Sequence, residues 1–208
     1  MYVPGYQSEQ DPERLWEAIR RHSFGSLICA DDEGRPVSTQ LPFIRRDERF
    51  LTHLAAANPQ SRLVADGRPV LCQFLGPHAY VSPAWYKESG HVPTWNYVQV
   101  VVSGHLVPLD RDGARFVVEE TVREHEQRRD DPVTPEQMAE RIDQLLDGIR
   151  AFEVIVEDIT GRFKLSQNRS VSDRRRIVTA LRAGDASQRG VADLMEGADP
   201  TEPPRREP

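Results

Sequence analysis

The middle of this chain is a series of short apolar runs separated by turn residues, without the regular strand–helix alternation of parallel sheets. Strand patterns are found at Gly25–Ala30, Val37–Ile44, Phe50–Leu54, Val70–Leu75, Ala79–Ser82, Trp95–Val107 and Ala151–Ile159. Parallel strands need long crossover connections, so strands that follow one another this closely pair antiparallel. The pattern therefore predicts an α+β fold in which an antiparallel barrel carries added helices.

Helical patterns lie at both ends of the chain and in one internal stretch. The first begins at Asp11, an N-cap residue followed by Pro12. The others cover Ala114–Arg128, Pro135–Leu146, Ser172–Arg182 and Asp185–Met195. We expect one domain over residues 1–183 with a helical insertion at about 111–148, followed by a C-terminal helix at 184–196. Residues 197–208 are rich in proline and charge, and we expect them to be disordered.

Composition excludes several classes of protein. No apolar run approaches the ~18–20 residues of a membrane span, and the N-terminus lacks a secretory signal pattern. We therefore expect a cytoplasmic protein that does not enter a membrane. Cys29 and Cys72 lie inside apolar strand patterns, which indicates buried reduced thiols.

The charge balance argues against nucleic acid as a partner. The 208 residues carry a net charge of −6, and the one compact basic run is Arg174-Arg175-Arg176 at an expected helix start. Phosphate binding usually needs a basic stripe, whereas one arginine triplet is typical of a solvated helix face. Of the 27 basic side chains only Lys87 and Lys164 are lysines. A lysine in such a background can mark a place where a neutral amine is needed, although chance retention also explains two cases.

Seven segments of the chain have a distinctive wording and read MYVP at 1–4, STQLPF at 38–43, ANPQ at 57–60, GPHAYVSP at 76–83, WY at 85–86, VPTWNY at 92–97 and KLSQNR at 164–169. In order and wording these segments resemble the PaiB-type family of FMN-binding negative transcriptional regulators, and the resemblance extends up to about Arg182. Two departures stand out. Gln40 replaces the histidine of the family's STHLPF pattern, and the loop between Tyr86 and Val92 is shorter than usual.

The resemblance implies a homodimeric split β-barrel of the pyridoxamine phosphate oxidase and FMN-binding type, with a flat cofactor at the subunit interface. The same family includes haem-dependent piperazate synthases, which close N5-hydroxy-ornithine into a six-membered ring by forming a nitrogen–nitrogen bond. Our leading hypothesis is therefore a haem b enzyme of this kind, acting on a small amino-acid substrate. The alternatives are an FMN-binding regulator and an FMN-dependent oxidoreductase.

Asn58-Pro59 marks an expected helix start and hence a candidate anion site. Free N–H groups and the positive end of a helix dipole favour a phosphate or carboxylate there. Thr39, Gln60 and Arg62 are the side chains that could assist. On sequence alone an ordinary helix cap explains this pattern better, and only the resemblance favours an FMN phosphate or a haem propionate.

His53 and His78 are the histidines that lie within family-like segments, and each is a candidate axial ligand of a haem iron. No haem attachment motif is present, so such a haem would be bound non-covalently. The alternative for each is a half-buried histidine whose nitrogens bond to the backbone. His22, His91, His105 and His125 have the pattern of surface, loop or helix-face residues.

The remaining candidates are two lysines and their neighbours. Ring closure needs a base that frees the attacking amine, and Lys164 or Lys87 could serve. We favour a ligand-facing role for Lys164, which has Gln167 beside it as a cofactor contact, and a solvent-exposed role for Lys87. Trp95 could stack on a cofactor ring. Trp95 and Tyr97 could instead pack at an interface, because alternate strand residues share a face.

Overall fold

A computed structural model describes residues 1–197, which form two compact units. Unit 1 comprises Met1–Arg21, Leu75–Val100 and the described residues from Thr160 onward. Unit 2 comprises His22–Phe74 and Val101–Ile159. Three long strands contribute residues to both units, and they are β6 (Pro69–Val81), β7 (Thr94–Pro108) and β8 (Ile149–Lys164).

The strands form one sheet in the order β3-β2-β6-β7-β8-β5-β4, with β1 also paired to β8. The shorter strands are β1 (Ser8–Glu9), β2 (Phe24–Ala30), β3 (Pro36–Pro42), β4 (Ile44–Arg46) and β5 (Arg49–Ala55). Strand β2 pairs antiparallel with both β3 and β6, so Leu27 lies opposite Thr39 on one side and Cys72 on the other. Strands β4 and β8 pair antiparallel with β5. The antiparallel sheet predicted from the strand pattern is confirmed.

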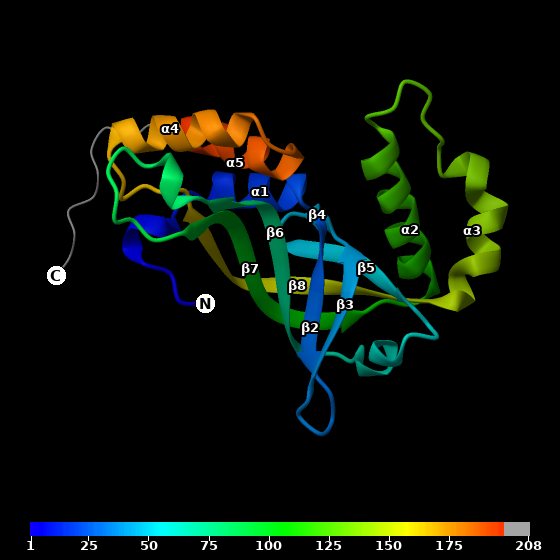
Figure 1. Ribbon diagram of the computed structural model, residues 1–208. Helices are drawn as coiled ribbons and strands as arrows, with labels where there is room; N and C mark the ends of the chain where they lie inside the picture. The colour runs from blue at the N-terminus through cyan, green and yellow to red at the C-terminus, as the bar shows by residue number, and fades with distance from the viewer. Residues whose placement is uncertain (198–208) are drawn as a thin grey trace. The chain divides into compact units, whose positions relative to one another are not determined.

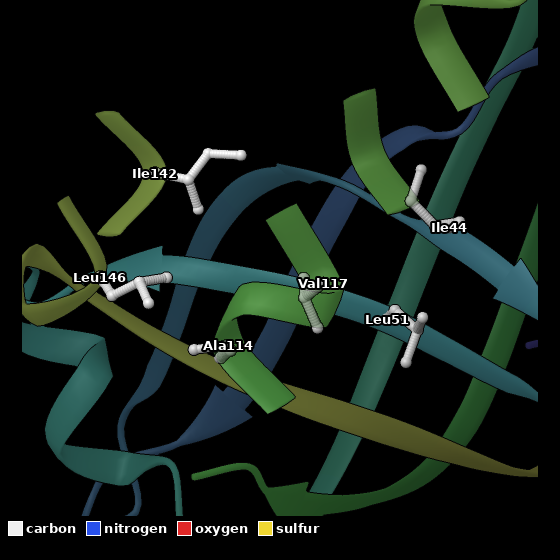
Figure 2. Close-up of a cluster of buried hydrophobic side chains, with 7 residues drawn as sticks. Ile44, Leu51, Ala114, Val117, Ile142 and Leu146 are labelled. Atoms are coloured by element: carbon white, nitrogen blue, oxygen red, sulfur yellow. The ribbon is translucent and has the colours of Figure 1, made fainter. Parts of the chain in front are cut away.

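In unit 2, strand β5 is covered on its two faces by different cores. On one face Leu51 packs with Ile44 against α2 (Arg111–Glu126) and α3 (Ala139–Leu145), which contribute Val117 and Ile142. Figure 2 shows this cluster. Phe50 alternates to the other face, where its ring contacts those of Phe43 and Phe74.

In unit 1, helices cover one face of the sheet. They are α1 (Pro12–Arg21), α4 (Val171–Arg182) and α5 (Ala186–Gly197), and Figure 1 shows them gathered on one side. Their apolar residues Leu15, Ile177 and Val191 are buried. Helix α1 approaches so closely that a side chain added to Gly161 of β8 would overlap Leu15. Burial of these apolar stripes is the main force that holds the helices on the sheet.

Single turns of 3-10 helix complete the structure, and two of them correct expectations. They are η1 (Gly5–Gln7), η2 (Pro59–Leu63), η3 (Pro83–Trp85), η4 (Glu136–Met138) and η5 (Leu146–Gly148). The expected helix after Asn58 is only the 3-10 turn η2. The expected helix at 135–146 is divided into η4, α3 and the start of η5, and helical segments run from Arg111 to Gly148.

Strand boundaries differ most from the predictions where glycine and proline stand together. We expected two strands at 70–75 and 79–82, but β6 is continuous. Its buried residues are even-numbered up to Gly76 and odd-numbered from Ala79, so the alternation shifts by one residue as it does at a β-bulge. The Gly76-Pro77 pair therefore marks a bulge rather than a turn. The expected strand at 37–44 is divided into β3 and β4, and β8 is longer than expected at both ends.

The structure also bears on the expectations for the cysteines, the C-terminal segment and membrane-spanning helices. Cys29 and Cys72 are buried and free, and burial raises the pKa of the Cys72 thiol. The C-terminal helix α5 ends at Gly197, and the rest of the segment predicted to be disordered lies outside the described residues. Across residues 1–197, none of the helices is both long and apolar enough to span a bilayer.

Helix α5 contains a glycine whose role can be tested. A Cβ atom on Gly190 would lie 2.9 Å from Cγ of Pro77. We expect Gly190→Ala to lower the melting temperature, because overpacking of about 1–3 kcal/mol exceeds the ~1 kcal/mol that alanine adds to a helix. Gly197→Ala in the same helix is the control, since, apart from its chain neighbours and the backbone of its own helix, none of residues 1–197 lies within 4 Å of a Cβ atom at that position. Equal melting temperatures for the two variants would show that this close approach is not tight.

Candidate functional site

The face of the unit 1 sheet opposite the three helices carries a row of aromatic and basic side chains. It consists of His78 and Tyr80 on β6, Trp95 and Tyr97 on β7, and Arg162 and Lys164 on β8, and we call it the aromatic–basic face. These positions alternate with the buried residues that meet the helices, such as Asn96, Val98 and Phe163. Because the buried residues of these strands pack on the side of α1, α4 and α5, the residues that alternate with them point to the opposite face of the sheet.

Trp95 is the centre of the aromatic part of this face. Its side chain is 51% exposed, although tryptophan is usually much more buried. The imidazole of His78 is stacked with it at a centroid distance of 6.0 Å, and the ring of Tyr80 meets it edge-on at 6.2 Å. Exposed rings grouped in this way form a surface on which a flat aromatic ligand can stack.

The basic part lies on the neighbouring strand. The Arg162 guanidinium is 5.4 Å from the ring centre of Tyr97 and donates a hydrogen bond of 2.8 Å to Gln7. Two residues on, Lys164 Nζ donates to Thr94 Oγ1 at 2.7 Å. Partial burial, and secondarily the positive charge of Arg162, lower the pKa of Lys164. Two cations held side by side provide a place for an anionic group.

His78 is held in a defined way by helix α5. Its N–H donates to Ser187 Oγ at 3.0 Å, and the Ser187 hydroxyl donates to the His78 carbonyl at 2.8 Å. The same Oγ lies 3.5 Å from Nδ1 of the ring. Because the hydroxyl's single proton is already donated, Oγ can only accept from Nδ1. Ser187 thus binds His78 mainly through the backbone N–H and carbonyl, and the ring is presented on the surface, where an imidazole nitrogen can reach a ligand.

The other residues predicted for the site in unit 1 are used differently. The Gln167 amide turns back on its own segment, where Oε1 accepts from the Leu165 N–H at 2.8 Å and Nε2 donates to the Phe163 carbonyl. Lys87 is exposed, and its backbone N–H donates to Asp173 at 2.8 Å. Neither contact directs these side chains to the aromatic–basic face.

In unit 2 the structure brings Thr39, Asn58 and Gln60 together. Asn58 Nδ2 donates to Thr39 Oγ1 at 3.0 Å, and Asn58 Oδ1 accepts from the Gln60 N–H at 2.9 Å. The next N–H, that of Ser61, bonds to the Asn58 carbonyl. Pro59 has no N–H, so the donors expected to bind an anion are engaged within the turn. This geometry matches the helix-cap alternative.

Two neighbours of this turn are likewise occupied or exposed. The Gln60 side chain is buried and donates from Nε2 to the Leu27 carbonyl at 3.2 Å, while its Oε1 is buried without a partner. Arg62 is exposed. Gln40, which replaces the family's histidine, donates to Ser26 Oγ at 2.8 Å.

His53 lies on β5 in unit 2, apart from these contacts. It shares a strand face with Leu51, the residue that packs against α2 and α3. Its Nδ1 is buried and has no hydrogen-bond partner among residues 1–197, and burial lowers the pKa of the imidazole from 6.5. At neutral pH it is therefore uncharged, as an iron ligand must be, but it lacks the hydrogen bond that usually orients a ligating histidine.

Arg162 and Thr94 were missed by the sequence analysis. The signal for Arg162 was its i, i+2 spacing from Lys164, which places two residues of a strand on one face, but the strand was expected to end at Ile159. No local pattern indicated Thr94, because its contact with Lys164 joins positions 70 residues apart.

Comparison with known proteins gives this geometry a context. A family model described as "Putative FMN-binding domain" matches residues 1–158. The Bacillus subtilis (strain 168) protein "Protease synthase and sporulation protein PAI 2" is 34% identical over 202 residues, which cover 94% of this chain and 97% of the relative.

Solved structures are similar in fold at low sequence identity. The FAD and haem binding protein from Mycobacterium smegmatis is 15% identical with a TM-score of 0.59, over 76% of this chain and 73% of the other. A protein from Bacteroides thetaiotaomicron, named as a putative 5-nitroimidazole antibiotic resistance protein, is 14% identical with a TM-score of 0.54, over 74% of this chain and 84% of the other. The split-barrel fold that the sequence resemblance implied is thereby confirmed.

The chain has only two lysines, so the pKa of Lys164 on the aromatic–basic face can be measured by NMR. With lysine labelled by ¹³C at Cε, the chain gives two side-chain signals, which Lys87→Arg assigns. We expect the titration midpoint of Lys164 to lie below that of an ordinary lysine. Arg162→Gln should raise it, because loss of a neighbouring positive charge favours the ammonium form. Arg21→Gln, which removes a cation paired with Glu17 on α1, should leave it in place. An ordinary Lys164 midpoint in the unmodified chain would refute this description of the face.

Proposed function

Because this chain belongs to the PaiB-type family, whose members carry an FMN-binding domain, we propose that it binds a flat anionic ring cofactor on the aromatic–basic face and that this cofactor is haem b. The observation that carries the proposal is the exposed imidazole of His78, which Ser187 holds by its backbone and which is stacked with the exposed ring of Trp95. An imidazole nitrogen held in this way is a suitable axial ligand.

The residues present fit both parts of such a cofactor. Tyr80, whose ring meets Trp95 edge-on, offers aromatic surface for a porphyrin, and Arg162 offers positive charge for a propionate. His53, neutral and with an unsatisfied Nδ1, is the second candidate ligand. The similarly folded Mycobacterium smegmatis protein is named for binding both FAD and haem, so the proposed cofactor has a precedent on this fold.

We further propose that the chain is an enzyme that cyclises N5-hydroxy-ornithine to piperazic acid. In this reaction the bond between the α-nitrogen and N5 forms, the N5–O bond breaks, and the hydroxyl leaves as water with a proton from the α-amine. Haem iron, when bound, would supply the Lewis acid that weakens the N–O bond. Lys164 would take the proton from the α-ammonium, since its lowered pKa makes the neutral amine more accessible. Its hydrogen bond to Thr94 orients Nζ.

The second candidate is an FMN-binding regulator, and the family description supports its FMN-binding part. The same face would accept an isoalloxazine ring on Trp95 and a phosphate at Arg162 and Lys164. An FMN-dependent oxidoreductase would use the face in the same way.

The DNA-binding part of the regulator hypothesis has less support from the helices. Arg174 is buried, and Arg176 donates to the Trp85 carbonyl. Arg182 pairs with Asp193 and Glu196 of α5. Most of the arginines of α4 are thus engaged within the protein, whereas a DNA-contacting helix presents them to phosphates.

An absorption titration distinguishes the cofactors. We expect purified chain to bind haem with a Soret band that is lost or shifted in His78→Ala and retained in His105→Ala, whose imidazole is tied to Glu157 instead. Loss in His53→Ala with retention in His78→Ala would transfer the ligand role to His53. A flavin spectrum after expression, with no Soret change on haem addition, would contradict the haem proposal and favour FMN.

Turnover tests the enzymatic step. With haem-loaded protein and N5-hydroxy-ornithine, we expect Lys164→Ala to lower kcat by about 10²–10⁴-fold, which is typical for loss of a general base. Formation of piperazic acid is followed by mass spectrometry. Haem binding without any cyclised product in the unmodified chain would contradict the proposed reaction while leaving the cofactor assignment intact.

A further inference from the structure

The segment that follows Lys164 is an unusually constrained turn in unit 1. Ser166 has a φ of +57°, a left-handed conformation that costs energy for residues other than glycine. It is nevertheless 6% exposed and lies two residues after the proposed base. A strained turn of this kind persists only where surrounding contacts enforce it.

Asn96 holds the turn from strand β7. Its side chain is fully buried, Nδ2 donates to Ser166 Oγ at 3.0 Å, and Ser166 Oγ donates to Asn96 Oδ1 at 3.1 Å. This reciprocal pair fixes the side chain that the strained residue carries. The same Nδ2 lies 3.4 Å from Sδ of Met195, on α5.

Arg174 holds the turn from helix α4. Its side chain is 4% exposed, Nη1 donates to the Leu165 carbonyl at 3.0 Å, and Nη2 donates to the Met195 carbonyl at 2.9 Å. The planar guanidinium thus joins the residue directly after Lys164 to the last turn of α5. Lysine has a single nitrogen and cannot reproduce this fork.

We propose that Arg174 is a positioning residue for Lys164, because its guanidinium fixes the Leu165 carbonyl against helix α5 and so sets where the Lys164 amine stands. The inference rests on the proposed function only in that Lys164 is the base there. Helix α4 already buries Ile177 and Leu181, and so it has an apolar attachment to the fold that does not involve the guanidinium. What the guanidinium adds is a constraint on the turn.

The same helix offers a matched comparison. Arg176 also donates to a backbone carbonyl outside α4, that of Trp85 at 2.8 Å, but Trp85 is not in the turn that carries Lys164. Arg174→Lys and Arg176→Lys both keep the positive charge and both add one lysine. A difference between the Lys164 midpoints of the two variants would therefore show that the contact with the Leu165 carbonyl affects Lys164 and the contact with the Trp85 carbonyl does not.

The test follows the Lys164 ¹³Cε signal through a pH titration of the full chain without cofactor. We expect Arg174→Lys to shift the Lys164 midpoint upward, toward that of an ordinary lysine, because a released turn exposes the amine to water. Arg176→Lys should leave it where it is in the unmodified chain. Arg162, the charged group known to act on Lys164, is unchanged in both variants.

An unmoved Lys164 midpoint in folded Arg174→Lys, or an equal shift in Arg176→Lys, would overturn the inference. If Arg174→Lys does not fold, Arg174→Gln replaces it, since glutamine removes the guanidinium fork and keeps a hydrogen-bond donor in its place. The same upward shift is then expected, and its absence overturns the inference. The titration of Lys164 needs no cofactor. Failure of the unmodified chain to bind haem would therefore refute the proposed function without affecting the test of Arg174.

Discussion

The burial of alternate strand residues under three helices is the constraint on which the rest of unit 1 depends. Gly161 of β8 lets Leu15 of α1 approach the strand, and Gly190 of α5 lets Pro77 of β6 approach the helix. Once the helices occupy that face, the pleat obliges every second side chain to point the other way. The aromatic–basic face is thus a consequence of core packing, which by itself places these side chains on the surface.

The ability of the aromatic–basic face to bind an anion depends on the positive charges of Arg162 and Lys164. Arg162 is near enough to Lys164 to help lower the pKa of that lysine, and the two cations donate to the neutral side chains of Gln7 and Thr94. Two cations bonded to neutral partners remain able to pair with an anion. The exposed ring of Trp95 lies on the neighbouring strand, so the face combines a stacking surface with positive charge, as a cofactor with a flat ring and acidic groups requires.

Much of the fold was predictable from the sequence, because period-two alternation and turn residues are local signals. The antiparallel strands, the helical insertion and the C-terminal helix were predicted in this way. The errors arose where a local signal had two meanings. Gly76-Pro77 marks a turn in many chains but a bulge within β6 here, and Asn58-Pro59 begins a single 3-10 turn instead of a longer helix.

The candidate site was less predictable, because its contacts join distant positions. Lys164 and His78 could be selected from composition and family resemblance. The residues that orient them, Thr94 and Ser187, lie 70 and 109 positions away and carry no signal of their own. Gln167 was expected to contact a cofactor because of its neighbours, yet its amide is used to close its own turn. Only the three-dimensional structure shows such use of a polar group.

A crystal structure of the chain loaded with haem tests the central claim most directly, namely that the sheet face of unit 1 opposite the three helices is the cofactor site. The account predicts electron density for a flat ring beside Trp95 and Tyr80, with an acidic group at Arg162 and Nε2 of His78 directed at the iron. Haem bound elsewhere, for instance at His53 without any contact to Trp95, Arg162 or Lys164, would contradict it.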